Sequence, residues 1–138
     1  MLNLINWKNE YSVGVDEIDA QHKNLLDMLN SLLQAIVEKK SKEGIEKVLE
    51  EMINYVDFHF KSEEKYTKPH PNFSEHRLEH WQFVKTTMEY QKKFGRNEDI
   101  SIQEIFEFLV NWLTKHIMGT DVRDFTYLRK NNLLKETP

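Results

Sequence analysis

The sequence predicts an all-α protein, an up-down-up-down four-helix bundle with an extended N-terminal arm and a short C-terminal helix. Two observations support this fold class. Four stretches repeat apolar residues at steps of three and four, the spacing of one helix face, and short segments with Gly, Pro, Asn or Ser separate them. No stretch alternates apolar and polar residues as a strand would. The 138 residues suffice for one core, so we expect a single domain over residues 1–138.

The first predicted elements are the arm and the first helix. Residues 1–18 include Gly14 and show no helical periodicity, so we expect them to lie extended across the domain. The first helix is expected at about residues 19–40, with Asp16 or Asp19 as its N-terminal cap. Its inward stripe consists of His22, Leu25, Leu29, Leu32 and Ile36.

The next two helices are separated by a Pro-His-Pro turn, which cannot continue a helix. We expect the second helix at about residues 42–67 and the third at about residues 73–94. Asn72 and Glu75 resemble a capping box at the start of the third helix. The inward stripe of the second helix consists of Ile45, Val48, Met52, Tyr55, His59, Glu63 and Tyr66. The inward stripe of the third helix consists of Phe73, His76, His80, Phe83, Thr87, Tyr90 and Phe94.

The fourth helix is expected at about residues 102–118. It opens with a capping box formed by Ser101 and Glu104, and Gly119 ends it. A short C-terminal helix is expected at residues 121–130. The inward stripe of the fourth helix consists of Ile102, Ile105, Leu109, Trp112 and His116.

Composition excludes several kinds of function. The net charge is -4 at pH 7 and no block of Lys or Arg stands out, so nucleic acid and anionic membranes are poor candidate partners. The sequence has no cysteine, which excludes disulfides, thiolate metal sites and cysteine nucleophiles. Because no apolar run is long enough to span a membrane or act as a signal peptide, we expect a cytoplasmic protein without membrane insertion. We also expect a monomer.

Ligand-type side chains converge at one end of the predicted bundle. Helices one and three run one way and helices two and four the other, so the starts of one pair lie level with the ends of the other. Six histidine and carboxylate side chains occupy these positions on the inward stripes: His22, His59, Glu63, His76, His80 and His116.

The alternative interpretation is that these groups are core residues. A single histidine on an apolar stripe is more often a hydrogen-bonded core residue than a metal ligand. Five imidazoles and a carboxylate removed from water together are very unfavourable unless they are paired or bind metal, which favours a metal site. Two nearby residues are interpreted differently. Glu64 is expected to be a solvated surface charge, and His70, off every stripe, to be exposed or to support the site without binding metal.

Asp121 has two equally good interpretations from spacing alone. It follows His116 by five residues, which is about 140° around a regular helix, so the two cannot share a face unless the helix changes. Gly119 offers a place to bend or unwind, after which Asp121 would lie near His116 as a ligand. Alternatively, Asp121 caps the short C-terminal helix.

Five neutral imidazoles and two carboxylates suit two metal ions better than one. A single ion would be over-supplied with ligands, and carboxylates readily bridge a pair of ions. Imidazole with carboxylate fits iron, zinc or copper, whereas Mg²⁺ and Ca²⁺ prefer more oxygen ligands. The spacing does not choose among iron, zinc and copper.

The motifs together resemble the hemerythrin family, and in particular its bacterial single-domain form. They are DAQHKNLL around His22, HFKSEE from His59, His76-x3-His80 and WLTKHIMGTD from Trp112, and the arm sequence WKNEYSVGVDEID fits as well. The resemblance covers essentially the whole chain. It departs from the family in the turn between the second and third helices, which is about two residues shorter than usual and has His70 where a tyrosine often precedes the proline.

The resemblance implies a non-haem di-iron centre with a bridging oxide or hydroxide. It implies that one iron is bound by His76, His80 and His116. The other iron would be bound by His22 and His59. The two bridging carboxylates would be Glu63 and Asp121. The resemblance thereby favours Asp121 as a ligand. The residues matching the O2 pocket are Leu25, Phe60, Trp112, Leu113 and Ile117.

The implied function is reversible O2 binding by a carrier, storage or delivery protein that is not an enzyme. O2 is then the ligand, and an O2-consuming enzyme is a candidate partner. Two alternatives stay open: a di-iron enzyme that acts on peroxide or nitric oxide, and an oxygen or iron sensor that works through a separate partner protein.

Overall fold

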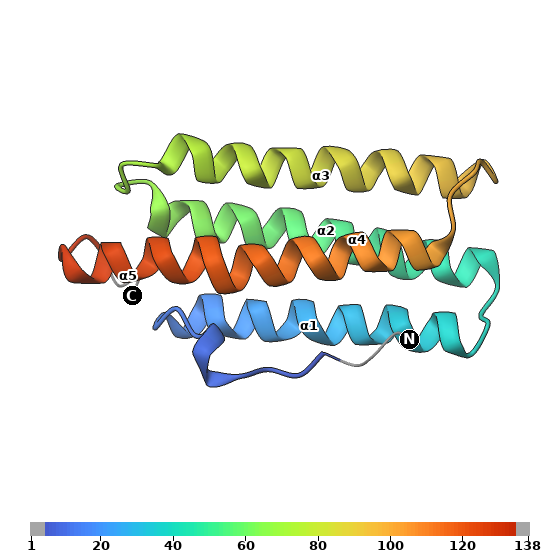
Figure 1. Cartoon of the computed structure of the whole chain (residues 1–138), viewed down its shortest axis with the longest axis horizontal. Coiled ribbons are helices and arrows are strands. Elements are labelled where there is room, and N and C mark those ends of the chain that lie inside the picture. Colours follow the sequence, from blue (N-terminus) through green and yellow to red (C-terminus); the bar gives the residue numbers. More distant parts are fainter. Residues whose placement is uncertain (1–4, 135–138) are drawn as a thin grey trace.

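The structure, a computed structural model, describes residues 5–134 and is an all-α bundle of four long antiparallel helices, as predicted (Figure 1). Residues 1–4 of the predicted arm lie outside the described residues, and residues 5–134 contain no strand. In chain order the elements are η1 (Asn9–Tyr11), α1 (Asp16–Val37), α2 (Lys42–Thr67), α3 (Phe73–Gly95), α4 (Ile102–Lys115), η2 (His116–Asp121) and α5 (Val122–Lys130).

Two helices begin at serine caps. The Ser41 hydroxyl accepts a hydrogen bond from the backbone N–H of Gly44, and Ser101 accepts one from Glu104, each at 3.1 Å. The predicted cap at Ser101 is therefore confirmed. The capping box expected at Asn72 is wrong, because the Asn72 side chain makes no capping hydrogen bond at the start of α3.

The start of α1 differs from the sequence prediction. The helix begins at Asp16 after Val15, so neither Asp16 nor Asp19 is its cap. Asp19 instead lies in the first turn, and its carboxylate accepts hydrogen bonds from the Ser12 hydroxyl at 2.5 Å and the Val13 backbone N–H at 2.8 Å. These bonds fold the preceding chain back over the helix start, and the helix begins three residues before the predicted position.

Besides these contacts with Asp19, two further contacts fasten the N-terminal arm to the bundle. The Asn30 side chain exchanges two hydrogen bonds with the backbone of Ile5, at 2.8 and 2.7 Å, which holds the arm beside α1 (Figure 1). Farther along, the Arg129 guanidinium of α5 donates to the backbone carbonyl of Val13. The arm therefore connects α1 to the C-terminal helix, although residues 9–11 form a short 3-10 turn rather than extended chain.

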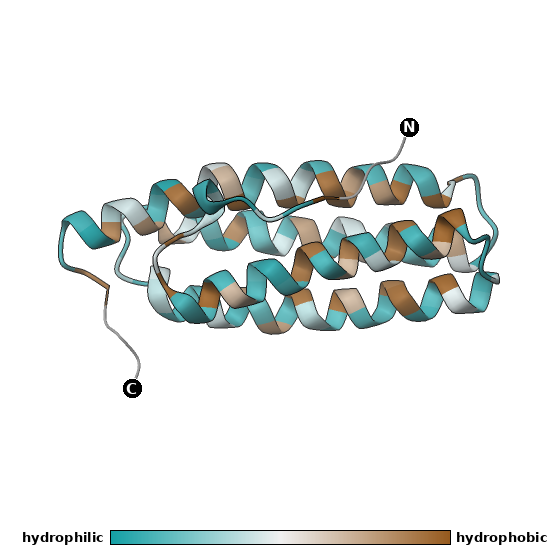
Figure 2. Cartoon of the chain, turned by 90° about the horizontal axis from the view of Figure 1, so that it is seen from below, coloured by the Kyte–Doolittle hydropathy of each residue, from teal (hydrophilic) through white to brown (hydrophobic). Residues whose placement is uncertain are grey.

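Within residues 5–134, the core consists of two separate apolar clusters. Each helix in Figure 2 carries brown and teal segments, as amphipathic helices do. The larger cluster fills most of the bundle, and the smaller one consists of Val13, Ile18, Tyr66 and Phe125. Along α1 the order is Ile18, His22, Leu25, so a polar position lies between the two clusters.

The fourth helix does not break at Gly119 as the sequence suggested. From His116 to Asp121 the backbone widens into a π-helical turn, and α5 continues directly from it. Apart from its own stretch of helix, no group in residues 5–134 lies within 4 Å of the position that a Gly119 Cβ would occupy, so no crowding requires glycine there. The helix prediction for residues 102–118 is corrected accordingly: α4 ends at Lys115 and a wide turn follows.

None of the helices in the described part of the chain is both long enough and apolar enough to cross a membrane.

We predict that Gly14→Ala destabilises the protein by about 1–3 kcal/mol, because Gly14 has φ 77°, a conformation that L side chains rarely adopt. The added methyl group would also overlap the Arg129 guanidinium. The matched control is Gly95→Ala, where the new methyl meets nothing within 4 Å. Urea unfolding should show a lower midpoint for the first variant only. Equal midpoints would contradict the assigned role of Gly14.

Candidate metal centre

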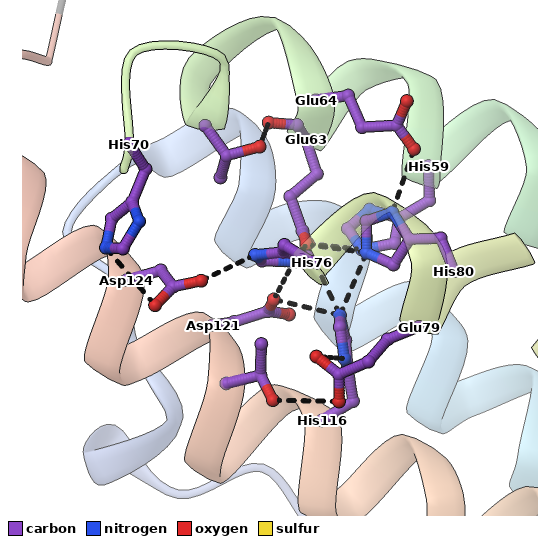
Figure 3. Close-up of polar contacts among 12 residues, drawn as sticks. His59, Glu63, Glu64, His70, His76, Glu79, His80, His116, Asp121 and Asp124 are labelled. Carbon is purple, nitrogen blue, oxygen red and sulfur yellow. Dashed lines mark hydrogen bonds and ion pairs between the residues drawn. The ribbon is translucent and has the colours of Figure 1, made fainter. Parts of the chain in front are cut away.

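The structure brings all seven predicted ligands together at one end of the bundle. Every one of these side chains is buried, with relative exposures of 0–2%. Figure 3 shows those from α2, α3 and η2 pointing toward a common point. The seven are His22 from α1, His59 and Glu63 from α2, His76 and His80 from α3, and His116 and Asp121 from η2.

Glu63 lies at the middle of the site and divides its two oxygens between two groups of histidines. Its Oε1 atom lies 2.6 Å from His76 Nε2, 3.1 Å from His80 Nε2 and 3.4 Å from His116 Nε2. Its Oε2 atom lies 3.3 Å from His22 Nε2 and 3.0 Å from His59 Nε2. One carboxylate thus faces three imidazoles on one side and two on the other.

Asp121 divides its oxygens in the same way. Its Oδ1 atom lies 3.0 Å from the Nε2 atoms of both His76 and His116, and its Oδ2 atom lies 3.1 Å from His22 Nε2. Neither oxygen accepts a well-directed hydrogen bond from any described residue, although both are buried. Buried carboxylate oxygens need a partner, and a metal ion between the carboxylate and the imidazoles would be one.

The donor atoms accordingly form two overlapping groups, within each of which all atoms lie within 4.8 Å of one another. We call them the three-histidine position and the two-histidine position. The three-histidine position comprises His76, His80 and His116, the two-histidine position comprises His22 and His59, and both share Glu63 and Asp121.

The π-helical turn places Asp121 near His116. In a regular α-helix these residues would lie about 140° apart. In a π turn each backbone N–H bonds to the carbonyl five residues earlier, so residue i+5 lies above residue i. The turn spans His116–Asp121, and the Asp121 carboxylate reaches the His116 ring. The spacing left Asp121 either as a ligand near His116 or as the cap of the C-terminal helix. The cap is not observed, since the Asp121 side chain makes no capping hydrogen bond to α5.

The two carboxylates control protonation of the imidazoles when no metal is bound. Burial lowers the pKa of His22, but the Asp121 and Glu63 carboxylates outweigh burial and raise it to about 9. The same balance raises the pKa of His76 to about 11, with Asp124 contributing as well. For His59, burial outweighs Glu63 and lowers the pKa. Despite burial, the imidazoles hold the pKa of Glu63 well below its usual value.

Three residues behind the histidines were missed or misread from the sequence. Each accepts a hydrogen bond from the Nδ1 atom of a histidine on another element. The acceptors are Gln21 for His59 at 2.7 Å, Asp124 for His76 at 2.8 Å, and Glu64 for His80 at 2.9 Å. The interpretation of Glu64 as a solvated charge is wrong. In the sequence, Gln21 directly precedes His22 and Glu64 directly follows Glu63. This adjacency to predicted ligands was the signal from which their role could have been predicted.

His70 is buried rather than exposed, at 8% relative exposure. Its Nδ1 atom accepts a hydrogen bond from the Asn72 backbone N–H at 2.9 Å, and its Nε2 atom lies 3.4 Å from Asp124 Oδ1. Its ring packs on Tyr127 with centroids 4.6 Å apart. Of the two sequence expectations for His70, exposure is wrong, and a supporting position behind His76 is what the contacts describe (Figure 3).

Two of the predicted pocket residues lie directly against imidazoles. The Phe60 ring stacks on His80, with centroids 3.8 Å apart and planes at 1°, and the Trp112 ring stacks on His116 at 4.6 Å and 15°. Phe83, which was not predicted, contacts Trp112 at 4.2 Å. The other predicted pocket residues are buried in the larger apolar cluster, and their lining role stays a prediction: Leu25, Leu113 and Ile117.

Comparison with known proteins agrees with this geometry. Residues 13–128 match the family model described as the hemerythrin HHE cation binding domain. The chain belongs to the hemerythrin family. The resemblance inferred from the sequence motifs is thus confirmed, and the buried cluster lies in a domain whose family description is cation binding.

Several hemerythrins are similar to this family member along most of their length. Bacteriohemerythrin from Methylococcus capsulatus is 36% identical over 121 residues, covering 86% of this chain and 92% of that protein. Bacteriohemerythrin from Clostridium acetobutylicum is 30% identical over 121 residues, covering 83% and 94%. A crystal structure of wild-type hemerythrin superposes with a TM-score of 0.79 at 33% identity, covering 88% of this chain and 95% of that one. These relatives are named as hemerythrins and not as enzymes, in agreement with the prediction of a non-enzyme.

We predict that metal binding to the metal-free protein releases protons at pH 7. The raised pKa values of His22 and His76, about 9 and about 11, leave both rings protonated there, and a metal must displace those protons. Affinity should therefore increase as the pH rises from 6 to 9. Calorimetric titration with Zn²⁺ in two buffers of different ionisation enthalpy measures the protons released. A binding enthalpy that is independent of the buffer would show that the rings are already neutral.

Proposed function

We propose that this protein binds O2 reversibly at a non-haem di-iron centre. The observation that carries the proposal is the division of two buried carboxylates between two groups of imidazoles. A carboxylate that offers one oxygen to each of two donor groups is suited to bridge two metal ions. An isolated structural histidine cluster has no need of this arrangement.

The donor set fits iron. It contains five imidazole nitrogens and two carboxylates, a mixture that suits first-row transition metals better than Mg²⁺ or Ca²⁺. We propose that His76, His80 and His116 hold one iron, that His22 and His59 hold the other, and that Glu63 and Asp121 bridge them together with an oxide or hydroxide. Membership of a cation-binding family and the hemerythrin relatives support this assignment.

The two positions offer different numbers of protein ligands. The three-histidine position has five ligand residues and the two-histidine position has four, counting the shared carboxylates in both. The two-histidine position therefore has more room for an external ligand. A pair of ferrous ions held here would supply the electrons that O2 accepts on binding and returns on release.

The surrounding residues keep water away from the site. Phe60, Leu113 and Ile117 are each no more than 3% exposed, and Leu25 is fully buried one turn from His22 on α1. An apolar wall of this kind leaves water and anions without hydrogen-bond partners near the bound ligand. Such a wall favours release of O2 unchanged over its further reaction. A cytoplasmic location, a monomeric state and an O2-consuming partner enzyme stay predictions from the sequence.

We predict two irons per chain. His76→Ala and His59→Ala should each lower the iron content, because each removes one imidazole ligand from one of the two positions. His70→Ala is the matched control and should retain near wild-type iron at saturation, since the structure gives His70 no contact with Glu63 or Asp121. Elemental analysis of the purified variants measures this. Loss of iron from all three variants alike would overturn the ligand assignment.

We also predict a reversible optical change. The reduced, iron-loaded protein should be nearly colourless, gain a visible charge-transfer band with O2, and lose it when argon removes the O2. Leu113→Ala or Ile117→Ala should hasten decay of the oxygenated form while both irons stay bound, because the cavity admits water. Stopped-flow mixing followed by sparging tests both. Continuous O2 consumption under a reductant, or turnover of peroxide or nitric oxide, would instead favour an enzyme.

A further inference from the structure

The Nδ1 atoms of the five histidines, which face away from the shared carboxylates, have unequal partners. At the three-histidine position, two of the three are hydrogen-bonded to carboxylates: His76 to Asp124 at 2.8 Å and His80 to Glu64 at 2.9 Å. The third, on His116, lies 3.9 Å from Glu79 Oε2, which is within ion-pair range but too long for a hydrogen bond. Three negative side chains thus stand behind this position (Figure 3).

At the two-histidine position, no carboxylate among residues 5–134 is hydrogen-bonded to a histidine Nδ1 atom. The His59 Nδ1 atom is paired with the neutral amide oxygen of Gln21 at 2.7 Å. The His22 Nδ1 atom is buried and has no hydrogen-bond partner among residues 5–134. The difference between the positions is therefore one of charge as well as of hydrogen bonding.

Asp124 is held in the orientation that it needs to serve His76. It is fully buried, and its Oδ1 atom accepts a hydrogen bond from the Arg123 Nε–H at 2.9 Å. The His70 ring approaches the same Asp124 Oδ1 atom. Because His70 Nδ1 accepts from the Asn72 backbone, the ring proton is on Nε2, which faces Asp124 Oδ1 at 3.4 Å. These contacts leave Oδ2 free to accept from His76 alone.

A carboxylate behind an imidazole has two effects on the far nitrogen. It fixes the proton on Nδ1, so that the Nε2 lone pair points at the site, and it makes the ring a stronger base. An amide acceptor fixes the ring orientation without adding negative charge. Both effects of the carboxylate therefore strengthen ligands of the three-histidine position only.

We propose that Asp124 and Glu64 are positioning residues that make the three-histidine position the tighter metal site, and that the neutral Gln21 keeps the two-histidine position weaker. Metal then fills the three-histidine position first. The inference rests on the proposed two-metal centre, which it deepens by ordering the two positions.

Titration of the metal-free protein with Zn²⁺, followed by calorimetry and by competition with a coloured chelator, tests this order. The wild-type protein should bind two equivalents in two steps, the first tighter. Asp124→Asn and Glu64→Gln should each weaken the first step by about 10–100-fold and leave the second step nearly unchanged. His22→Ala should abolish the second step only, and His76→Ala the first.

Gln21→Glu gives a result that mere loss of structure cannot produce. It places a carboxylate behind His59, so the second step should become tighter and approach the first. Matched controls are Glu50→Gln and Asp27→Asn, which change exposed side chains on α2 and α1. Both controls should titrate like the wild type.

Different failures have different meanings. If the wild-type protein binds fewer than two equivalents, the two-metal centre itself is wrong. Suppose instead that two equivalents bind, but Asp124→Asn and Glu64→Gln weaken both steps equally, or Gln21→Glu leaves the second step unchanged. The ordering of the positions is then overturned while the centre stands. Melting of each metal-free variant separates a general loss of stability, which would move both steps, from a change at one position.

Discussion

The contact of one buried carboxylate, Glu63, with five imidazoles is the interaction on which the rest of the structure depends. A fully buried charge without partners costs several kcal/mol, comparable to the whole stability of a small domain. Glu63 avoids that cost only because imidazoles reach it from α1, α2, α3 and η2 at one level. An antiparallel bundle with short connections brings these side chains to the same height along the bundle axis, since each helix start lies beside a helix end.

The bundle accommodates this polar layer by placing it between two apolar clusters. Three segments of the chain repeat the same order, with an apolar residue on either side of a predicted ligand. On α1 the order is Ile18–His22–Leu25, and on α2 it is Phe60–Glu63–Tyr66. Along η2 and α5 it is Ile117–Asp121–Phe125. Apolar contacts on both sides of the polar layer therefore add to the contacts that Glu63 makes with the imidazoles in holding the helices together. The arm and the Val13–Arg129 contact close the smaller cluster on its outer side.

Periodicity was sufficient to predict the bundle and the inward placement of five histidines and Glu63, because both follow from which residues share a helix face. It could not predict the groups behind the ligands. A residue next to a ligand in sequence is rotated by about 100° and points toward the neighbouring helix. Gln21, beside His22, therefore serves His59 of α2, and Glu64, beside Glu63, serves His80 of α3. The π turn was also beyond periodicity, because it changes the helical repeat itself.

The imidazoles of the three-histidine position have more ring and hydrogen-bond contacts than those of the two-histidine position. At the three-histidine position, the Phe60 ring lies flat on His80 and the Trp112 ring on His116, so neither imidazole turns without losing its stacking contact. Asp124 and Glu64 fix two of the rings from behind as well. At the two-histidine position the Gln21 amide holds His59 from behind, but His22 meets His59 only edge to face at 4.7 Å and has no hydrogen bond on its Nδ1 atom within the described chain. If metal is bound as proposed, a change in coordination would be accommodated most easily at the two-histidine position, which also offers fewer donor residues. Fixed imidazoles on one side and a less constrained His22 on the other would suit the proposed centre, which binds and releases a small molecule without rearranging the bundle.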